Sequence, residues 1–294
     1  MSVDTVTDAT DADERTVGAD WSADADRRRP SALAMAGRIW SWTWPKLLAI
    51  GIVIGFWQLL IWMEWRPLFV LPAPATVFSE LASLVTTARF WESVSTTLQR
   101  AAFGYLTALV IGSLLGIAVS RVRTLRLAVG SLITGLQTMP SIAWFPFAIV
   151  VFGGTNKAIY FVVVLGAAPS IANGIISGID HVPPTFVRLG RVLGANGFTL
   201  YRHIVLPAAM PSYVAGLSQG WAFAWRSLMA GELLVIVLGV TSIGANLEFA
   251  RQFSRMDEVI AWMIVILVIG MVADTIFTSM SRSLRRRRGL AIDD

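Results

Sequence analysis

The chain has 294 residues, of which 55% are hydrophobic and 15% charged, and its formal net charge is +5. This composition is typical of a multi-pass membrane protein. The positive charge does not indicate a nucleic-acid-binding protein, because the arginines gather at the ends of apolar segments and in short loops. The absence of cysteine excludes disulfides, thiolate nucleophiles and Cys-ligated metals.

Residues 1–30 are predicted to form a disordered acidic tail. They include eight Asp and Glu residues among Ala, Thr and Ser, with few side chains able to build a core. The tail lacks the basic start and short apolar run of a cleavable signal peptide, so we expect it to stay in the cytosol. A transmembrane domain is expected over residues 31–281, followed by a basic cytosolic tail over residues 282–294.

Six apolar segments are predicted to cross the membrane as α-helices, because about 20 residues span about 30 Å of hydrocarbon. They are residues 47–62, 98–120, 125–152, 158–179, 208–238 and 259–280. Six spans place both termini on one side of the membrane. The arginine-rich loops and the basic tail then face the cytosol, as the positive-inside rule requires. The expected fold is an all-α membrane protein with six transmembrane helices.

Three of these spans carry a small residue at every fourth position, which forms a nearly straight ridge on a helix. The ridges are Gly104, Ala108, Gly112, Gly116 and Ser120, then Gly166, Ser170, Gly174 and Gly178, then Ser212, Gly216, Gly220 and Ala224. Such ridges let helix backbones approach closely in a membrane. We expect them to pack the bundle, and a sliding surface between two packed states is the alternative.

The third span is interrupted by Pro140 and Pro146, which predicts a broken helix. The polar or amphipathic residues beside the break are Gln137, Ser141 and Trp144. Broken helices in a membrane are tolerated where protein or water satisfies the freed backbone groups, and they often line cavities. These three residues are therefore candidates for the translocation pathway.

The fifth span carries two charged residues, which are costly inside a membrane. Arg226 and Glu232 lie six residues apart on different helix faces, so they are not expected to pair. Gln219 lies seven residues before Arg226 on the same face, and the two form a polar stripe suited to an anion. Arg226 either lines the pathway or snorkels to the outer interface. Glu232 is also a pathway candidate, although a structural role near Gly231 is favoured.

The loop over residues 182–207 is predicted to contain two short helices. Pro183 and Pro184 suit a helix start, and Gly194 suits the left-handed position that ends a helix. Thr199 is expected to cap the second helix, and Pro207 is expected to end it. The loop is apolar on one side and basic on the other, which suits docking onto a protein surface rather than a solvated connector.

From Gly194 onward, this loop resembles the cytoplasmic loop of permease subunits of ABC importers that use a solute-binding protein. The family pattern is E-A-A, three residues, G, nine residues and then I-x-L-P. Ile204, Leu206 and Pro207 keep this spacing from the glycine, whereas Arg188, Leu189 and Gly190 replace E-A-A. The residues 71–74, 137–140, 152–153 and 230–233 further resemble the nitrate, sulfonate, taurine and bicarbonate branch of the family.

The resemblance implies a homodimer in the plasma membrane, surrounded by lipid, in which each loop seats in a groove of a separate ABC ATPase subunit. The implied ATPase-coupling residues are Gly194, Tyr201, Ile204, Leu206 and Pro207. A solute-binding protein outside the cell would deliver a small anion, with sulfonate-like compounds marginally preferred. ATP and Mg²⁺ would bind only to the ATPase, because this sequence has no phosphate-binding G-x-x-x-x-G-K-[ST] motif. The permease itself is then not an enzyme.

Two other classes of protein were weighed against the importer. In a self-contained secondary transporter or channel, Glu232 and Asp274 would be the proton or ion sites. An intramembrane enzyme would need paired acids, a metal site or an activated nucleophile, and the sequence offers none of these. His181 and His203 have no partner at ligand spacing, so they are interpreted as cytosolic surface residues.

Overall fold

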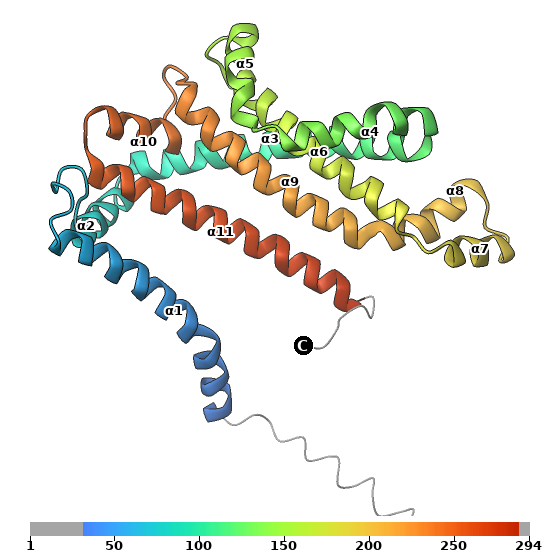
Figure 1. The fold of residues 1–294 in the computed structure, drawn as a ribbon, viewed down its shortest axis with the longest axis horizontal. Helices are drawn as coiled ribbons and strands as arrows, with labels where there is room; N and C mark the ends of the chain where they lie inside the picture. Colours follow the sequence, from blue (N-terminus) through green and yellow to red (C-terminus); the bar gives the residue numbers. More distant parts are fainter. Residues whose placement is uncertain (1–31, 288–294) are drawn as a thin grey trace, which may run out of the picture. The chain divides into compact units, whose positions relative to one another are not determined.

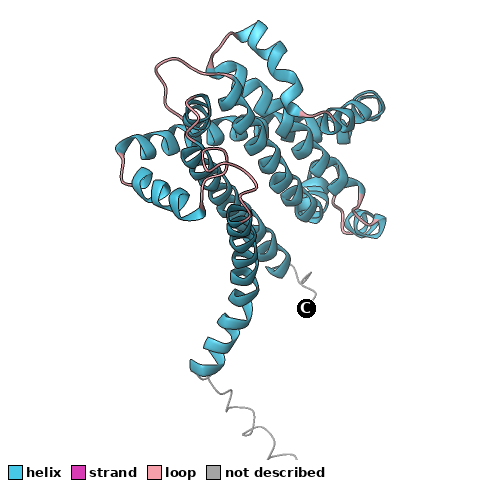
Figure 2. Ribbon diagram, turned by 60° about the vertical axis from the view of Figure 1, so that its left-hand side comes forward, coloured by secondary structure: helices cyan, strands magenta, loops and turns pink. Residues whose placement is uncertain are grey.

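A computed structural model describes residues 32–287, which consist of helices and loops without a β-strand (Figure 2). The predicted tail over residues 1–30 lies outside this part. The chain divides into two units at Met63. The described part of the first unit is a single long helix, α1 (Ala32–Trp62), with Pro45 inside it. The second unit begins at Glu64 and contains all the sites discussed below.

The second unit contains four long helices and six shorter ones (Figure 1). In chain order they are α2 (Pro74–Val85), α3 (Ala88–Arg121), α4 (Arg123–Thr138), α5 (Phe145–Phe152), α6 (Asn156–Asp180), α7 (Pro184–Val192), α8 (Gly197–Leu200), α9 (Leu206–Leu234), α10 (Ile243–Gln252) and α11 (Met256–Arg287). A 3-10 turn (Ser141–Trp144) precedes α5, and a π-helical turn (Tyr201–Val205) precedes α9.

The core of the unit is α6, which packs between α3 and α9 through the predicted small-residue ridges. A Cβ placed on Gly174 would lie 2.7 Å from the Cα of Gly216 on α9. A Cβ placed on Gly112 of α3 would lie 2.6 Å from the carbonyl oxygen of Ala168. The backbones thus touch at both interfaces, and the prediction that the ridges pack helices is confirmed.

Four helices of the described part are long and apolar enough to cross a bilayer: Trp44–Trp62 of α1, all of α3, all of α6, and Met256–Met280 of α11. A fifth span is counted if α4 and the segment Ser141–Phe152 cross the membrane together. The 29-residue α9 is not among them, since small and polar residues interrupt its apolar ones. The count of six spans stays a prediction.

The predicted break in the third span is confirmed. Thr124–Thr138 and Ser141–Phe152 meet at an angle of 103° around Pro140, which cannot continue a helix. Phe145 then anchors α5 in the core, where it is fully buried. A Cβ on Gly231 of α9 would lie 2.9 Å from the Phe145 ring, so only glycine lets α5 approach this closely.

Candidate transport pathway and coupling surface

Three of the predicted pathway residues line one pocket beside the broken span, which we call the Arg226 pocket. It has a volume of about 330 Å³ and is lined by Gln137, Thr138, Met139, Pro140, Ser141, Ile142, Phe223, Arg226 and Ala230. The exposed Arg226 guanidinium lies 5.7 Å from the centre of the Phe223 ring. One cation and several hydroxyl or amide groups therefore face a space that suits a small anion.

A second pocket lies between α6 and α9 and holds the predicted residue Gln219. We call it the Asn173 pocket; its volume is about 270 Å³, and it is lined by Ser170, Asn173, Gly174, Ser177, Pro211, Ser212, Ala215, Gly216 and Gln219. None of these nine residues is charged. Asn173 and Gln219 are both exposed within the single chain. No local sequence pattern distinguishes Asn173 as a pathway residue.

Gln137 connects the two pockets. Its side-chain NH₂ group donates a hydrogen bond to the Ser170 hydroxyl at 2.9 Å, and its carbonyl oxygen faces the Asn173 amide at 3.5 Å. Ser141 is held on the other side by the Ser227 hydroxyl, at 2.8 Å. The pockets thus form one polar track, in which Gln137 marks the boundary.

The other two predicted pathway residues lie outside both pockets. Trp144 is half-buried and packs its ring edge-to-face with Phe147, with the ring centres 6.3 Å apart. Glu232 is fully buried at the end of α9. Neither is part of the track that joins Gln137, Ser141, Gln219 and Arg226.

Glu232 is held by a set of buried polar groups. Its carboxylate accepts hydrogen bonds from the Arg100 guanidinium at 2.9 Å, from the Thr97 hydroxyl at 2.9 Å and from the backbone N–H of Gly244 at 3.1 Å. Gly244 lies in the first turn of α10, where the helix dipole also favours a negative charge. The three hydrogen-bond donors, one of which is a cation, satisfy this buried carboxylate within the protein.

The same face of α3 carries further contacts to α10. Asn246 donates to the Ser93 hydroxyl at 2.6 Å, and its side-chain oxygen accepts from Arg89 at 2.8 Å. The six residues Arg89, Ser93, Thr97, Arg100, Glu232 and Asn246 make up what we call the polar seam. The seam ties α3, the end of α9 and the start of α10 together. Sequence reasoning missed Arg100, although a charge inside a predicted span should prompt a search for its partner.

At the opposite end of α9 from α10, the loop 182–207 joins α6 to α9 (Figure 1). Its first half is as predicted: α7 begins at Pro184 directly after Pro183. Gly194 adopts a left-handed conformation, with φ of +83°. Its N–H donates to the Arg191 carbonyl, which satisfies one of the last carbonyls of α7.

The second half of the loop is helical, as predicted, but the predicted start and end of its helix are wrong. Thr199 does not cap a separate helix, because α8 begins after Asn196, at Gly197. Nor does Pro207 end a helix. The chain continues from α8 through the π-helical turn into α9, and Pro207 lies in the first turn of α9, where its missing N–H costs little.

Three of the implied coupling residues, Tyr201, Ile204 and Leu206, pack within the loop or against the bundle. A Cβ on Gly190 of α7 would lie 2.8 Å from the Leu200 side chain and would also meet Ile204, so these two side chains pack closely against α7. Tyr201 lies under the Arg121 guanidinium at 5.0 Å. Leu206 lines an apolar pocket between α3, α6 and α9.

Other residues of the loop present an apolar surface, which we call the apolar patch. It consists of Phe186, Leu189, Val192, Leu193 and Phe198, whose exposed fractions lie between 51% and 83%. Arg188, Arg191 and Arg202 of the same loop are also exposed, and residues 182–207 contain no Asp or Glu. The patch is the kind of surface that a protein partner covers.

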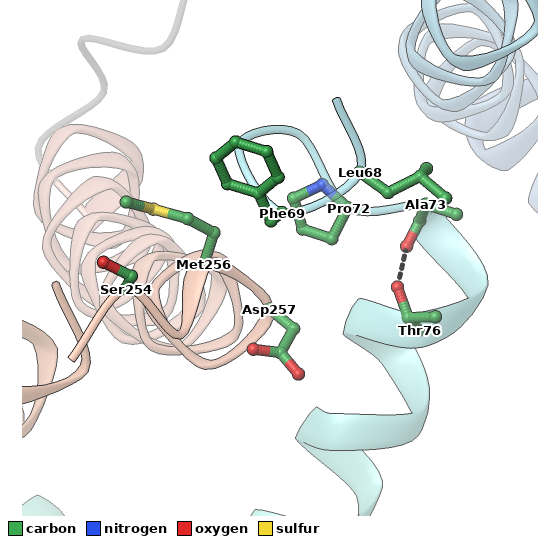
Figure 3. Close-up of a pocket in the computed structure, with 8 residues that line it drawn as sticks. All are labelled: Leu68, Phe69, Pro72, Ala73, Thr76, Ser254, Met256 and Asp257. Carbon is green, nitrogen blue, oxygen red and sulfur yellow. Dashed lines mark hydrogen bonds between the residues drawn. The ribbon is translucent and has the colours of Figure 1, made fainter. Parts of the chain in front are cut away.

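A further pocket of about 300 Å³ lies between the segment before α2 and the start of α11, lined by the eight residues drawn in Figure 3. Thr76 donates to the Ala73 carbonyl at 2.7 Å at its edge. Of these eight residues, the charged one is Asp257. A carboxylate beside apolar side chains does not suit an anion, so this pocket is not part of the track.

Comparison with known proteins agrees with these features. Residues 108–288 match the family described as "Binding-protein-dependent transport system inner membrane component". A putative ABC transporter permease of Methanocaldococcus jannaschii is 32% identical over 232 residues, which cover 78% of this chain and 85% of the relative. A putative aliphatic sulfonates transport permease of Bacillus subtilis is 27% identical, covering 83% and 88%. The taurine transport system permease of Escherichia coli is 25% identical, covering 83% and 92%.

A solved structure of a bacterial alginate ABC transporter, in complex with its alginate-bound periplasmic protein, shares the fold. The superposition has a TM-score of 0.59 at 15% identity and covers 84% of this chain and 98% of the other. The family match extends over more than half of the chain. The chain is therefore a member of the family of inner-membrane permease components of binding-protein-dependent ABC importers.

Proposed function

We propose that this permease works as a homodimer and carries a small oxyanion, of the sulfonate, taurine, nitrate or bicarbonate class, across the cytoplasmic membrane. The observation that supports this best is the Arg226 pocket, where one guanidinium and the polar groups of Gln137 and Ser141 face the same space. None of the described residues that line the polar track is acidic. A field of this sign favours an anion.

The names of two relatives favour sulfonates within that class. The Bacillus subtilis relative is named for aliphatic sulfonates, and the Escherichia coli relative for taurine, which is also a sulfonate. A sulfonate has three oxygens that accept hydrogen bonds, which suits guanidinium, amide and hydroxyl donors. A solute-binding protein outside the cell would deliver it.

The energy would come from ABC ATPase subunits that bind ATP and Mg²⁺. The apolar patch and its three arginines are the surface proposed for this contact, in a groove whose rim is acidic. Gly194, Tyr201, Ile204, Leu206 and Pro207 would transmit movement of the patch to α9. Because Tyr201 and Ile204 are held against Arg121 and α7, the loop would move as a rigid lever. This arrangement places the loop and both termini in the cytosol.

The homodimer is proposed from the exposure of polar groups on α6 and α9. Asn173, Gln219 and Arg226 face outward from the single chain, where lipid could not satisfy their hydrogen bonds. A second copy facing the same side would cover them and enclose the track. This arrangement is favoured over a self-contained transporter with Glu232 and Asp274 as ion sites, because Glu232 is fully buried and already bonded to Arg100 and Thr97.

Uptake tests the substrate. Cells that produce the permease with its ATPase and binding protein should take up labelled ethanesulfonate or nitrate in an ATP-dependent way. An unlabelled neutral solute of similar size should not reduce the uptake of either labelled anion. If neither anion is taken up, or if a cation is taken up instead, the proposed substrate class is wrong.

Cross-linking through an introduced cysteine tests the dimer, because the chain has no cysteine of its own that could form a competing disulfide. Gln219→Cys should form a disulfide between two copies in membranes. Leu106→Cys, at an exposed position of α3, is the matched control and should not. Equal cross-linking at both positions, or cross-linking at Leu106 alone, would place the dimer interface elsewhere.

A further inference from the structure

The Asn173 pocket carries an inference beyond the proposed function, on which it rests. The pocket lies beside the Arg226 pocket on the same polar track, and no described residue that lines it bears a charge. Gln219 and Arg226 are seven residues apart on α9, which corresponds to about 10 Å along the helix axis. A substrate that leaves the guanidinium toward α7 would therefore meet this pocket next.

The side chains of the pocket offer unused hydrogen-bond donors. Ser170 is 1% exposed. Its oxygen accepts from Gln137 at 2.9 Å, and its own O–H has no acceptor among the described residues. Ser212 and Gln219 also make no side-chain hydrogen bond within residues 32–287 and line the same space. A buried hydroxyl proton without an acceptor is costly, so a group that accepts it is expected.

The floor of the pocket is the closest approach of α6 and α9. Gly174 and Gly216 face each other with their backbones in contact, and a Cβ on either would lie 2.7 Å from the Cα of the other. Glycine at both positions is what lets the two helices come this close. The donors of α6 and α9 that line the pocket are therefore held side by side by the helix crossing itself.

We infer that the Asn173 pocket is a second binding site for the transported oxyanion, built from neutral hydroxyl and amide donors, and that Gln137 separates it from the Arg226 pocket. A pathway needs sites that attract the solute but also release it. Neutral donors hold an anion less tightly than a guanidinium does. The order of a charged site and then an uncharged site would let the anion leave Arg226 and continue.

Two substitutions at one position test this inference in the complete complex of permease, ATPase and binding protein. Asn173→Asp puts a negative charge in the pocket with almost no change in size, and Asn173→Ala removes the amide without adding charge. The expected result is a fall of about tenfold or more in ethanesulfonate uptake for Asn173→Asp, since like charges repel, and a smaller fall for Asn173→Ala. ATP hydrolysis stimulated by the binding protein should persist in both variants.

Gln252→Glu is the matched control. It makes the same change from amide to acid at an exposed position at the end of α10, which neither pocket includes. Its uptake should equal that of the unmodified complex. Unchanged uptake in Asn173→Asp, or equal losses in the Asp and Ala variants, would overturn the second site. Absence of both ethanesulfonate and nitrate uptake by the unmodified complex would instead overturn the proposed substrate class.

Discussion

Glu232 and Arg226 lie on the same helix, six residues apart, and the protein treats the two charges in opposite ways. Glu232 is fully buried and bonded to Arg100, Thr97 and the N–H of Gly244. Arg226 is exposed in a pocket, beside the ring of Phe223. A charge inside a membrane protein is thus structural when protein groups satisfy it, and a candidate for solute contact when they do not.

The largest effect is expected from breaking the buried pair. Glu232→Ala leaves the Arg100 guanidinium buried without its carboxylate, which costs about 3–5 kcal/mol. The variant should be produced in low yield and should unfold at a clearly lower temperature in detergent. Glu232→Gln keeps the shape of the side chain and one acceptor oxygen but not the charge, and should lose less stability. Normal stability in Glu232→Ala would show that the polar seam does not stabilise α3 and α10.

The loop over residues 182–207 offers the same comparison between a buried and an exposed residue, here with apolar side chains. Leu200 is buried and Phe198, two residues earlier, is exposed. Phe198→Asp should therefore leave the permease folded but weaken ATPase co-purification, by about 2 kcal/mol if the residue is a hot spot of the interface. Leu200→Asp should instead lower the stability of the permease itself. Undiminished co-purification with Phe198→Asp would exclude the apolar patch as the ATPase contact.

The charge of the loop provides a related test. Arg188 and Arg191 are exposed, and no acid lies within residues 182–207. Arg188→Glu restores the residue type that the family pattern has at this position, yet it should weaken co-purification of this permease's own ATPase if the groove is acidic at its rim. Stronger binding after the substitution would show that the rim is basic.

Arg226 should behave in the opposite way to Glu232. Arg226→Ala should lower anion uptake about tenfold, the effect of losing a charge-assisted hydrogen bond, while the unfolding temperature stays unchanged. Arg66→Ala is the control, because Arg66 is also an exposed arginine over an aromatic ring, at 5.2 Å from Trp65, but lines neither pocket of the track. Equal uptake in both variants would assign Arg226 to snorkelling rather than to the pathway.

The smallest effect concerns an exposed ion pair, as a counterpart to the buried one. Arg251 on α10 donates to Glu248 at 2.8 Å and lowers the pKa of that carboxyl below its ordinary value of 4.5. Its stabilisation is therefore fully present above pH 4.5 and is lost as the pH falls through the lowered pKa. In Glu248→Gln, the free energy of unfolding should no longer show the small decrease that losing this pair causes as the pH falls below 4.5. The same pH dependence in the variant and the unmodified protein would mean that the pair contributes nothing.

Local features of this fold could be predicted from the sequence. Small residues at every fourth position predicted the close helix crossings. They form a ridge of small side chains on one helix face, and a second backbone can pack closely against it. Pro140 predicted the broken span, and Gly194 the left-handed turn. Each of these features depends on the conformational limits of one residue type or on helix periodicity.

Features that depend on distant residues could not be predicted in this way. Arg100 and Glu232 are 132 positions apart, and no local pattern indicates that they meet. The same holds for Gln137 and Ser170, whose bond joins the two pockets. The course of the chain from α8 into α9 differs from the prediction for another reason. A proline such as Pro207 can follow the end of one helix, but it also fits the first turn of the next, where its missing N–H costs little.

The central claim is that this helical bundle moves solute only when an attached ATPase supplies the energy. The direct test is uptake into liposomes that contain the purified permease, with and without its ATPase subunit, in the presence of the binding protein and labelled anion. Uptake should require both the ATPase and ATP, and an ion gradient alone should drive none. Uptake by the permease alone under an ion gradient would contradict the account and identify a self-contained transporter.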